Sequence, residues 1–313
     1  MKAVRRMEFK FSAKEYKERA PEFCIPEDNP DYSSEDGVLF NKDKTVLLRF
    51  PTESPIRHYK LPDSVEEIRA YSFGKCRLES LDLNKVRRAG SRALWSCESL
   101  KELDLGTEIQ VLTKGMIFGC HGLHSLVLPP NVRELRDCFV EMCSNLNEIT
   151  IPRTVKKMGR MPFGCGNVIV HFEYNGAAIH VREQSLEPGQ NGDLIDLKYY
   201  DSTFRQFSLA THRNSYRPLT AFLRLAYPVD LTEEWKELYV KFLRRYVREF
   251  AAEIFAKNKV DWVRILVEQN VIFEDNIDCL IEDSAAAGKT AITAFLLDHK
   301  RKSLPERDDE FEL

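Results

Sequence analysis

The sequence lacks the features that mark membrane-spanning, secreted and nucleic-acid-binding proteins. It has no run of about 18 apolar residues, so a membrane-spanning helix is not expected. Its 46 basic and 49 acidic residues nearly balance, with a net charge of −3, which gives no bulk attraction to nucleic acid or anionic lipid. The basic residues near the start are not followed by an apolar stretch of about 7–15 residues, so no signal peptide is expected.

The sequence also lacks the motifs of common active sites and cofactor sites. No H-E-x-x-H, G-x-S-x-G or C-x-x-C motif occurs. The segment "AAAGKT" (285–290) resembles the end of a phosphate-binding loop, but Asp283 stands where that loop needs its first glycine, and its carboxylate would repel phosphate. We therefore predict no catalytic residue, no cofactor and no metal site. The 8 cysteines and the missing export signal favour a reducing cytoplasm, with export by an unrecognised route as the alternative.

What the sequence does contain is one phrase repeated over residues 58–173. Five cysteines recur at steps of 21, 23, 23 and 22 residues, namely Cys76, Cys97, Cys120, Cys143 and Cys165. An apolar column keeps the same step, namely Val65, Val86, Ile109, Val132 and Val155. After each of the first four cysteines comes an L-x-x-L-x-L phrase, as in Leu100/Leu103/Leu105 and Leu123/Leu126/Leu128. A period of about 20–29 residues with this phrase is typical of a leucine-rich-repeat solenoid.

The repeat also predicts where the core lies. One unit cannot bury its own apolar face, so it needs a copy on each side. The L-x-L part alternates with period two, as a half-buried strand does, so stacked copies should form a parallel sheet. Leu103 and Leu126, central in their phrases, are expected in the core. The cysteines are interpreted as a buried column of small apolar thiols, one in each coil.

The phrase resembles the BspA-like leucine-rich repeat of bacteria and some protists. Its clearest copies are "LPDSVEEIRAYSFGKCRLESLDL" (61–83) and "LPPNVRELRDCFVEMCSNLNEITIP" (128–152). The resemblance covers residues 36–173 and implies a solenoid that binds proteins or surface ligands without catalysis. The first repeat has one residue fewer between Cys76 and Leu78. The fifth loses the phrase and is interpreted as the closing rung, with Val168, Val170 and Phe172.

The remaining segments complete the predicted organisation. Residues 1–35 form an N-terminal segment, and "DGVLFNKDKTVLLRFP" predicts a β-hairpin, within residues 36–57, that caps the first coil. The repeats occupy 58–176. A turn-rich connector covers 177–217, in which 194–200 is predicted as a strand. An all-helical domain covers 218–302, and an acidic tail covers 303–313. The fold class is therefore α+β, a solenoid of about five coils followed by an all-α domain.

The helical domain contains a second near-repeat. Thr232 is predicted to cap a helix whose apolar stripe continues from Trp235 to Ile254. Beyond it, "FAKNKVDWVRILVEQ" (255–269) aligns with "AAAGKTAITAFLLDH" (285–299) at an offset of 30 residues. This pattern resembles the helical part of ankyrin repeats, although the step is shorter than in that family and the T-P-L-H turn is missing.

Two surfaces are candidates for binding. Strand alternation places the x residues of each L-x-x-L-x-L phrase on the open face of the sheet, namely Ser80, Asp82, Glu102, Asp104, Ser125, Val127, Glu148 and Thr150. Solenoids commonly bind partners across such faces, although any strand must expose some residues. A basic helical patch consists of Lys241, Arg244, Arg245 and Arg248. Nucleic-acid binding is one interpretation of it, and a solvated face with Glu237 and Glu249 as partners is the favoured one.

The leading hypothesis is a cytoplasmic, non-enzymatic module that binds an unknown protein partner through the leucine-rich-repeat sheet. It rests on two repeat architectures in one chain without a catalytic constellation. The alternatives are an exported or surface-binding effector, and an enzyme whose site lies in the cleft between the two domains. No nucleic acid and no membrane span are expected.

Overall fold

The computed structural model of the chain describes residues 22–159, 161–165, 168–181, 195–206 and 217–303. The chain divides into two compact units, Met1–Asn175 with Val181–Asp196, and Gly176–His180 with Leu197–Leu313. Strand β19 (Ala178–Val181) contains residues of both units. Most of the predicted N-terminal segment, much of the connector and nearly all of the acidic tail lie outside the described residues. The predicted domain boundaries stay predictions.

The first unit begins with three antiparallel strands. β1 (Tyr32–Glu35) pairs with β2 (Val38–Asn41), and β2 pairs with β3 (Val46–Arg49). Between β2 and β3, the Lys44 N–H donates to the Asn41 carbonyl over 3.1 Å, and Lys44 has a φ of 54°. β3 then pairs in parallel with β5 (Glu67–Ile68), so its backbone hydrogen bonds continue into the repeats.

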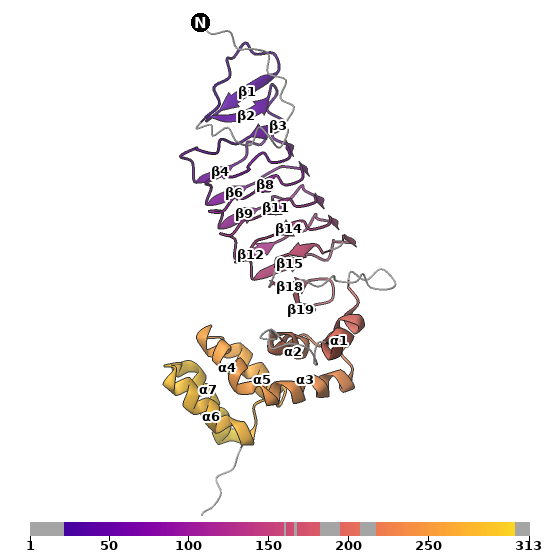
Figure 1. Cartoon of the computed structure of the whole chain (residues 1–313), viewed down its shortest axis with the longest axis vertical. Coiled ribbons are helices and arrows are strands. Elements are labelled where there is room, and N and C mark those ends of the chain that lie inside the picture. The colour runs from indigo at the N-terminus through magenta and orange to yellow at the C-terminus, as the bar shows by residue number, and fades with distance from the viewer. Residues whose placement is uncertain (1–21, 160, 166–167, 182–194, 207–216, 304–313) are drawn as a thin grey trace, which may run out of the picture. The chain divides into compact units, whose positions relative to one another are not determined.

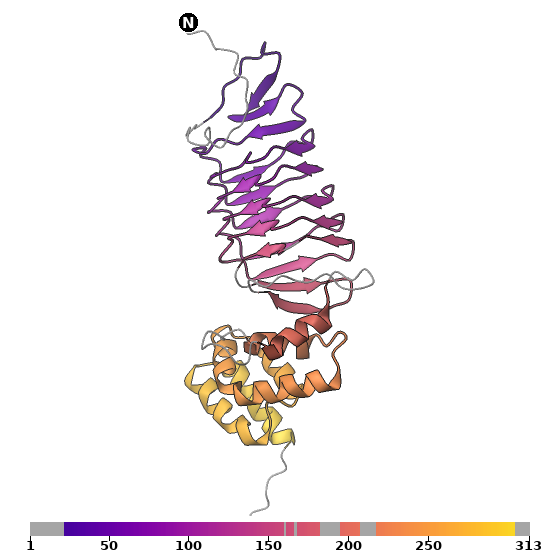
Figure 2. The same cartoon turned by 45° about the vertical axis from the view of Figure 1, so that its right-hand side comes forward.

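Each turn of the repeats contributes short strands that stack in parallel on those of the next turn (Figures 1 and 2). The first series contains the leucine phrases: β4 (His58–Lys60), β6 (Ser80–Asp82), β9 (Glu102–Asp104), β12 (Ser125–Val127), β15 (Glu148–Ile151) and β18 (Val168–Phe172). The second series is β5, β7 (Arg88–Ala89), β10 (Val111–Leu112), β13 (Glu134–Leu135) and β16 (Lys157–Met158). The third series is β8 (Leu94–Trp95), β11 (Ile117–Phe118), β14 (Val140–Glu141) and β17 (Phe163–Gly164).

These series confirm the predicted β-solenoid. The first series has six strands, one more than the predicted number of coils. The difference arises because β18 pairs in parallel with β15 although it lacks the leucine phrase. Its alternating Val168, Val170 and Phe172 are buried, and this alternation is enough to continue the sheet.

The repeated columns form the core of the solenoid. The apolar column from Val65 to Val155 is at most 2% exposed, and the cysteine column from Cys76 to Cys165 is at most 3% exposed. All five of these thiols are free, as the interpretation of a buried thiol column requires. Leu126 is 2% exposed, but Leu103 is only half-buried, so its predicted place in the core is wrong.

The second unit is helical. Its described helices are α1 (Leu197–Gln206), α2 (Arg217–Ala226), α3 (Glu233–Arg245), α4 (Val247–Ala256), α5 (Val260–Glu268), α6 (Glu274–Ala286) and α7 (Thr290–Ser303). The predicted all-α part is therefore confirmed, and the predicted cap is present because Thr232 Oγ1 accepts from the Trp235 N–H over 3.5 Å. None of these helices is both long and apolar enough to cross a membrane.

Two helical predictions are wrong in detail. The predicted strand at 194–200 is instead the start of α1, where Leu197, Asp201 and Phe204 are buried at helical spacing. The long stripe from Trp235 is divided between α3 and α4, because Tyr246 leaves the helical conformation with φ −117° and ψ 20°.

The near-repeat of the last four helices is visible in their turns. Asn258, between α4 and α5, and Gly288, between α6 and α7, are 30 residues apart and both have positive φ, 52° and 67°. Leu266 and Leu296, at the same offset of 30, are both buried. The resemblance to ankyrin repeats stays a prediction.

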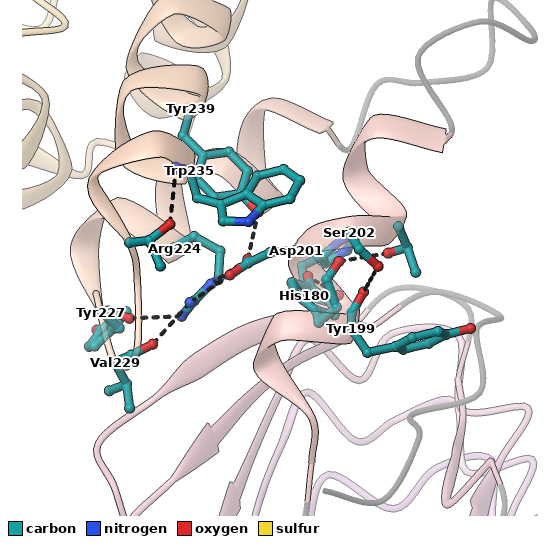
Figure 3. Close-up of polar contacts among 12 residues, drawn as sticks. His180, Tyr199, Asp201, Ser202, Arg224, Tyr227, Val229, Trp235 and Tyr239 are labelled. Carbon is teal, nitrogen blue, oxygen red and sulfur yellow. Dashed lines mark hydrogen bonds and ion pairs between the residues drawn. The ribbon is translucent and has the colours of Figure 1, made fainter.

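A buried polar network joins the first three helices (Figure 3). Arg224 of α2 is 0% exposed, and its Nε and Nη2 donate to the two carboxylate oxygens of Asp201 in α1 over 2.8 and 3.0 Å. Arg224 also donates to the carbonyls of Tyr227 and Val229, over 3.3 and 2.9 Å. Tyr239 of α3 completes the network by donating its hydroxyl to Asp201 Oδ1 over 2.6 Å. The bidentate ion pair thus fixes α1, α2, α3 and the chain that follows α2.

Burial keeps the tyrosines of this region protonated. Burial, followed by the charge of Asp201, raises the pKa of Tyr239 far above its usual range, so the hydroxyl donates at all ordinary pH values. Burial likewise raises the pKa of Tyr200 to about 12, and its hydroxyl donates to the His180 carbonyl over 2.8 Å. Both groups therefore act as hydrogen-bond donors and not as bases.

We expect Leu126→Ala to lower the free energy of unfolding by about 2–5 kcal/mol, the range for truncating a buried leucine. Leu103→Ala, at the same strand position one coil earlier, is the matched control and should cost clearly less, since Leu103 is only half-buried. Urea unfolding of both variants measures the difference. Equal losses, or unchanged unfolding of Leu126→Ala, would contradict the register of the repeats.

We also expect Arg224→Met to cost about 3–5 kcal/mol, because it leaves the Asp201 carboxylate buried without its cation. The double variant Asp201→Leu/Arg224→Met should cost much less than the sum of the two single variants, because it removes both charges. Loss of the helical circular-dichroism signal in urea provides the measurement. Additive single-site losses would show that the pair is not coupled.

Candidate functional site

The predicted binding residues lie on one face of the solenoid, in two columns. Parallel pairing places Ser80 opposite Glu102 and Asp82 opposite Asp104, in β6 and β9. In β12 and β15 it places Ser125 opposite Glu148 and Val127 opposite Thr150. Five of the eight residues are exposed, and Ser80, Asp82 and Thr150 are half-buried. We call this surface the open face, defined by these eight residues.

Two of the acidic residues on the open face stabilise the solenoid itself. Asp82 Oδ1 accepts the N–H of Asn84 over 2.7 Å, and Asp104 Oδ1 accepts the N–H of Gly106 over 2.8 Å. Asn84 and Gly106 have φ values of 52° and 68°, so each aspartate closes a turn that needs a left-handed residue. Asp82 also forms an ion pair with Lys60 over 3.1 Å. The acidic character of the open face therefore rests mainly on Glu102 and Glu148.

The open face is interrupted between its second and third phrases. Among the described residues, no backbone hydrogen bond joins β9 to β12, and none joins β7 to β10 in the second series. The third series is continuous there, since β8 pairs with β11. The interruption accounts for the exposure of Leu103, because β9 lacks a strand partner on that side.

Repeat length explains this interruption. The coil from Cys76 to Cys97 has 21 residues, whereas the next two have 23. One residue is missing between Cys76 and Leu78, and another between Leu83 and Val86. A shorter coil cannot follow the same path around all three series, so its strands pair with the next full-length coil in only one of them. We call this interruption the seam.

A hollow of about 520 Å³ lies at the seam in the second series, lined by Arg87, Arg88, Ala89, Glu108, Gln110, Val111 and Thr113. Its side chains are partly paired with one another and with the neighbouring coil. Arg88 forms an ion pair with Glu67 over 3.1 Å, and Arg87 lies 3.9 Å from Glu108. Thr113 Oγ1 is buried without a hydrogen-bond partner. The hollow has polar groups of both signs but no constellation for nucleophilic or acid–base catalysis.

The cysteine column does not make a reactive site. Cys97 donates its thiol to the Phe73 carbonyl, and Cys120 donates to the Leu94 carbonyl, over 3.1 and 3.2 Å. Hydrogen bonding to the adjacent thiols, followed by burial, raises the pKa of Cys97 well above its usual range. A protonated, buried thiol is a poor nucleophile and a poor metal ligand. In the part of the chain that the structure describes, no group of three or more His, Cys, Asp or Glu could hold a metal ion.

The basic helical patch is largely used inside its own unit. Arg248 donates to both carboxylate oxygens of Asp283, over 2.6 and 2.8 Å. Arg244 donates to the Asn270 carbonyl over 2.9 and 2.7 Å, and its guanidinium lies 4.4 Å from the centre of the Phe273 ring. These contacts tie α3 and α4 to the chain after α5 and to α6. They differ from the glutamate partners expected from the sequence, and they leave few cations for a phosphate backbone.

Sequence reasoning missed the seam and the buried network of Asp201, Arg224 and Tyr239. The seam has a visible signal, the two missing residues in one coil. The network has none, because its residues are polar and far apart in the chain, and an analysis of apolar periodicity passes over them.

Comparisons with known proteins agree with this architecture. The family described as BspA type leucine rich repeat region matches residues 50–167 in 6 copies. No curated protein matches the chain. A leucine rich cell surface protein from Faecalibacterium prausnitzii A2-165 is 24% identical with a TM-score of 0.42, covering 47% of this chain and 40% of that chain. The pneumococcal vaccine antigen PcpA is 25% identical with a TM-score of 0.44, covering 49% of this chain and 40% of that chain.

A leucine rich repeat protein from T. pallidum is 20% identical with a TM-score of 0.37, covering 44% of this chain and 66% of that chain. The chain thus spans less than half of the first two structures, 40% of each. The family match falls on the stacked coils described above. Residues 50–167 are BspA-type leucine-rich repeats, and the chain is a leucine-rich repeat protein with a helical C-terminal part.

Proposed function

We propose that the protein is a non-catalytic scaffold that binds a protein partner through the open face. The leucine-rich-repeat fold is in general a scaffold for protein interaction, and it is typically not catalytic. The observation that carries the choice of face is Val127, which is 67% exposed in the middle of a strand. Exposed apolar residues surrounded by polar ones are a common mark of a binding surface.

Four residues form the proposed contact, namely Glu102, Ser125, Val127 and Glu148. All four are exposed, and no hydrogen bond or ion pair of their side chains within the described residues holds them in the solenoid. Asp82 and Asp104 are excluded from the contact because their carboxylates close turns. A partner with a basic rim and an apolar centre would match a valine flanked by two glutamates.

We expect Glu102→Lys/Val127→Lys to abolish partner capture without unfolding the protein. The matched control is Glu66→Lys/Gln110→Lys, which makes the same change in charge at exposed positions beside the second strand series. The whole protein is cross-linked in its source cells, and the captured proteins are compared by quantitative mass spectrometry. A partner lost with the first variant and kept with the control supports the open face. A partner kept with both variants would exclude it.

We further propose that the protein works in the reducing cytoplasm. The five thiols of the cysteine column lie in successive coils, and the sulfurs of Cys76 and Cys97 are 3.3 Å apart without a covalent bond. Such neighbouring thiols persist unpaired where the thiol pool is kept reduced.

Rapid alkylation of source cells in denaturant, followed by mass spectrometry, should therefore find all 8 cysteines alkylated. A disulfide between neighbouring coils, such as Cys76 with Cys97, would instead favour the export alternative. Protein oxidised in vitro before alkylation serves as the positive control for that product.

A further inference from the structure

A second face of the solenoid exposes large apolar side chains, on the third strand series. Pairing of β8, β11, β14 and β17 places Trp95 beside Phe118, Phe118 beside Glu141, and Glu141 beside Gly164. Met142 follows β14 and is 58% exposed, and Met161 precedes β17 and is 45% exposed. Tyr71 packs edge to face against Trp95, with ring centres 6.1 Å apart. We call Tyr71, Trp95, Phe118, Met142 and Met161 the aromatic–methionine strip.

Three members of the strip occupy backbone positions that disfavour them. Tyr71, Met142 and Met161 have φ values of 59°, 55° and 45°, in the left-handed region where a Cβ atom is strained. The third coil has glycine at both equivalent positions, Gly115 and Gly119, with φ values of 60° and 67°. The fold therefore accepts glycine at these positions. Large side chains kept under strain and exposed to solvent point to a role outside folding.

The aromatic half of the strip is basic. Lys75 Nζ lies 5.0 Å from the centre of the Trp95 ring, and the Arg92 guanidinium carbon lies 5.2 Å from the centre of the Phe118 ring. Lys114, just before Gly115, is exposed. None of these three cations forms an ion pair with another described residue. Their positive charge lies along rings that offer apolar area, a combination enriched at protein interfaces.

The methionine half differs in charge. Glu141 lies between Phe118 and Gly164 in the strand register, and Asp137 precedes Cys138 in the same coil. Glu98, after Cys97, is a further exposed carboxylate beside the strip. A phosphate backbone running along the whole strip would meet repulsion at Glu141 and Asp137. An acidic peptide needs to place its carboxylates only over the first three coils, and its apolar side chains can continue onto the methionines.

We infer that the aromatic–methionine strip binds an acidic, extended segment of a protein partner. The carboxylates of that segment face Lys75, Arg92 and Lys114. Its apolar side chains lie on Phe118, Met142 and Met161, since methionine adapts its shape to different partners. This surface is separate from the open face, and the inference does not depend on the function proposed for that face.

The test uses the whole protein and two pools of fluorescein-labelled peptides, read by fluorescence anisotropy. One pool contains Asp, Glu, Leu, Phe and Gly, and the other replaces Asp and Glu by Asn and Gln. The wild type should prefer the acidic pool, and raised salt should weaken that binding. Met142→Gly/Met161→Gly should weaken binding to the acidic pool about tenfold, as expected when interface anchors are removed. Its urea unfolding midpoint should be unchanged or higher, because glycine relieves the strained backbone.

Further variants separate the possible outcomes. Lys75→Gln/Lys114→Gln should abolish the preference for the acidic pool, and Glu102→Lys/Val127→Lys on the open face should leave it unchanged. Equal binding of both pools by the wild type would overturn the inference, as would binding that the methionine variant leaves intact. Preference for a labelled thymidine oligonucleotide over the acidic pool would overturn it in favour of single-stranded nucleic acid, which also stacks on aromatic rings.

Discussion

The repeat part depends on one constraint, the backbone hydrogen bonding between successive coils. A coil is too small to bury its own apolar face, so its fold is stable only when its strands pair with those of its neighbours. Pairing in all three series requires that two adjacent coils follow the same path, and hence have the same length between corresponding residues. The apolar and cysteine columns keep side chains in phase, but the number of residues between the columns decides whether the backbones meet.

The seam shows how that constraint affects function. The 21-residue coil loses pairing with its neighbour in two series and keeps it in the third. The open face is therefore divided into two shorter sheets, β4-β6-β9 and β12-β15-β18, while the face with the aromatic–methionine strip stays continuous. A partner that spans several coils would find a rigid, unbroken strand ladder only on the third series. The division also explains why Leu103 differs from Leu126, although the two occupy the same place in their phrases.

The sequence was sufficient to predict the solenoid, its apolar columns, the buried thiols and the helical second part, because each leaves a periodic signal. It was not sufficient where a polar side chain binds backbone. Asp82 and Asp104 were predicted as partner-binding residues from alternation alone, and their hydrogen bonds to Asn84 and Gly106 depend on the turn that follows. Helix α1 was missed for a related reason, since its buried face includes Asp201, a residue that apolar periodicity does not count.

Equivalent positions in different coils also separate requirements of the fold from requirements of function. Where the backbone must be left-handed, the third coil has glycine and other coils have tyrosine, arginine, lysine or methionine. The same backbone at each position shows that the solenoid does not need those side chains, and the strain shows that they are disfavoured. Exposed large side chains at strained positions therefore call for an explanation outside folding. The buried ion pair of Asp201 and Arg224 is the opposite case, because its polar groups are satisfied internally and its effect is confined to holding helices together.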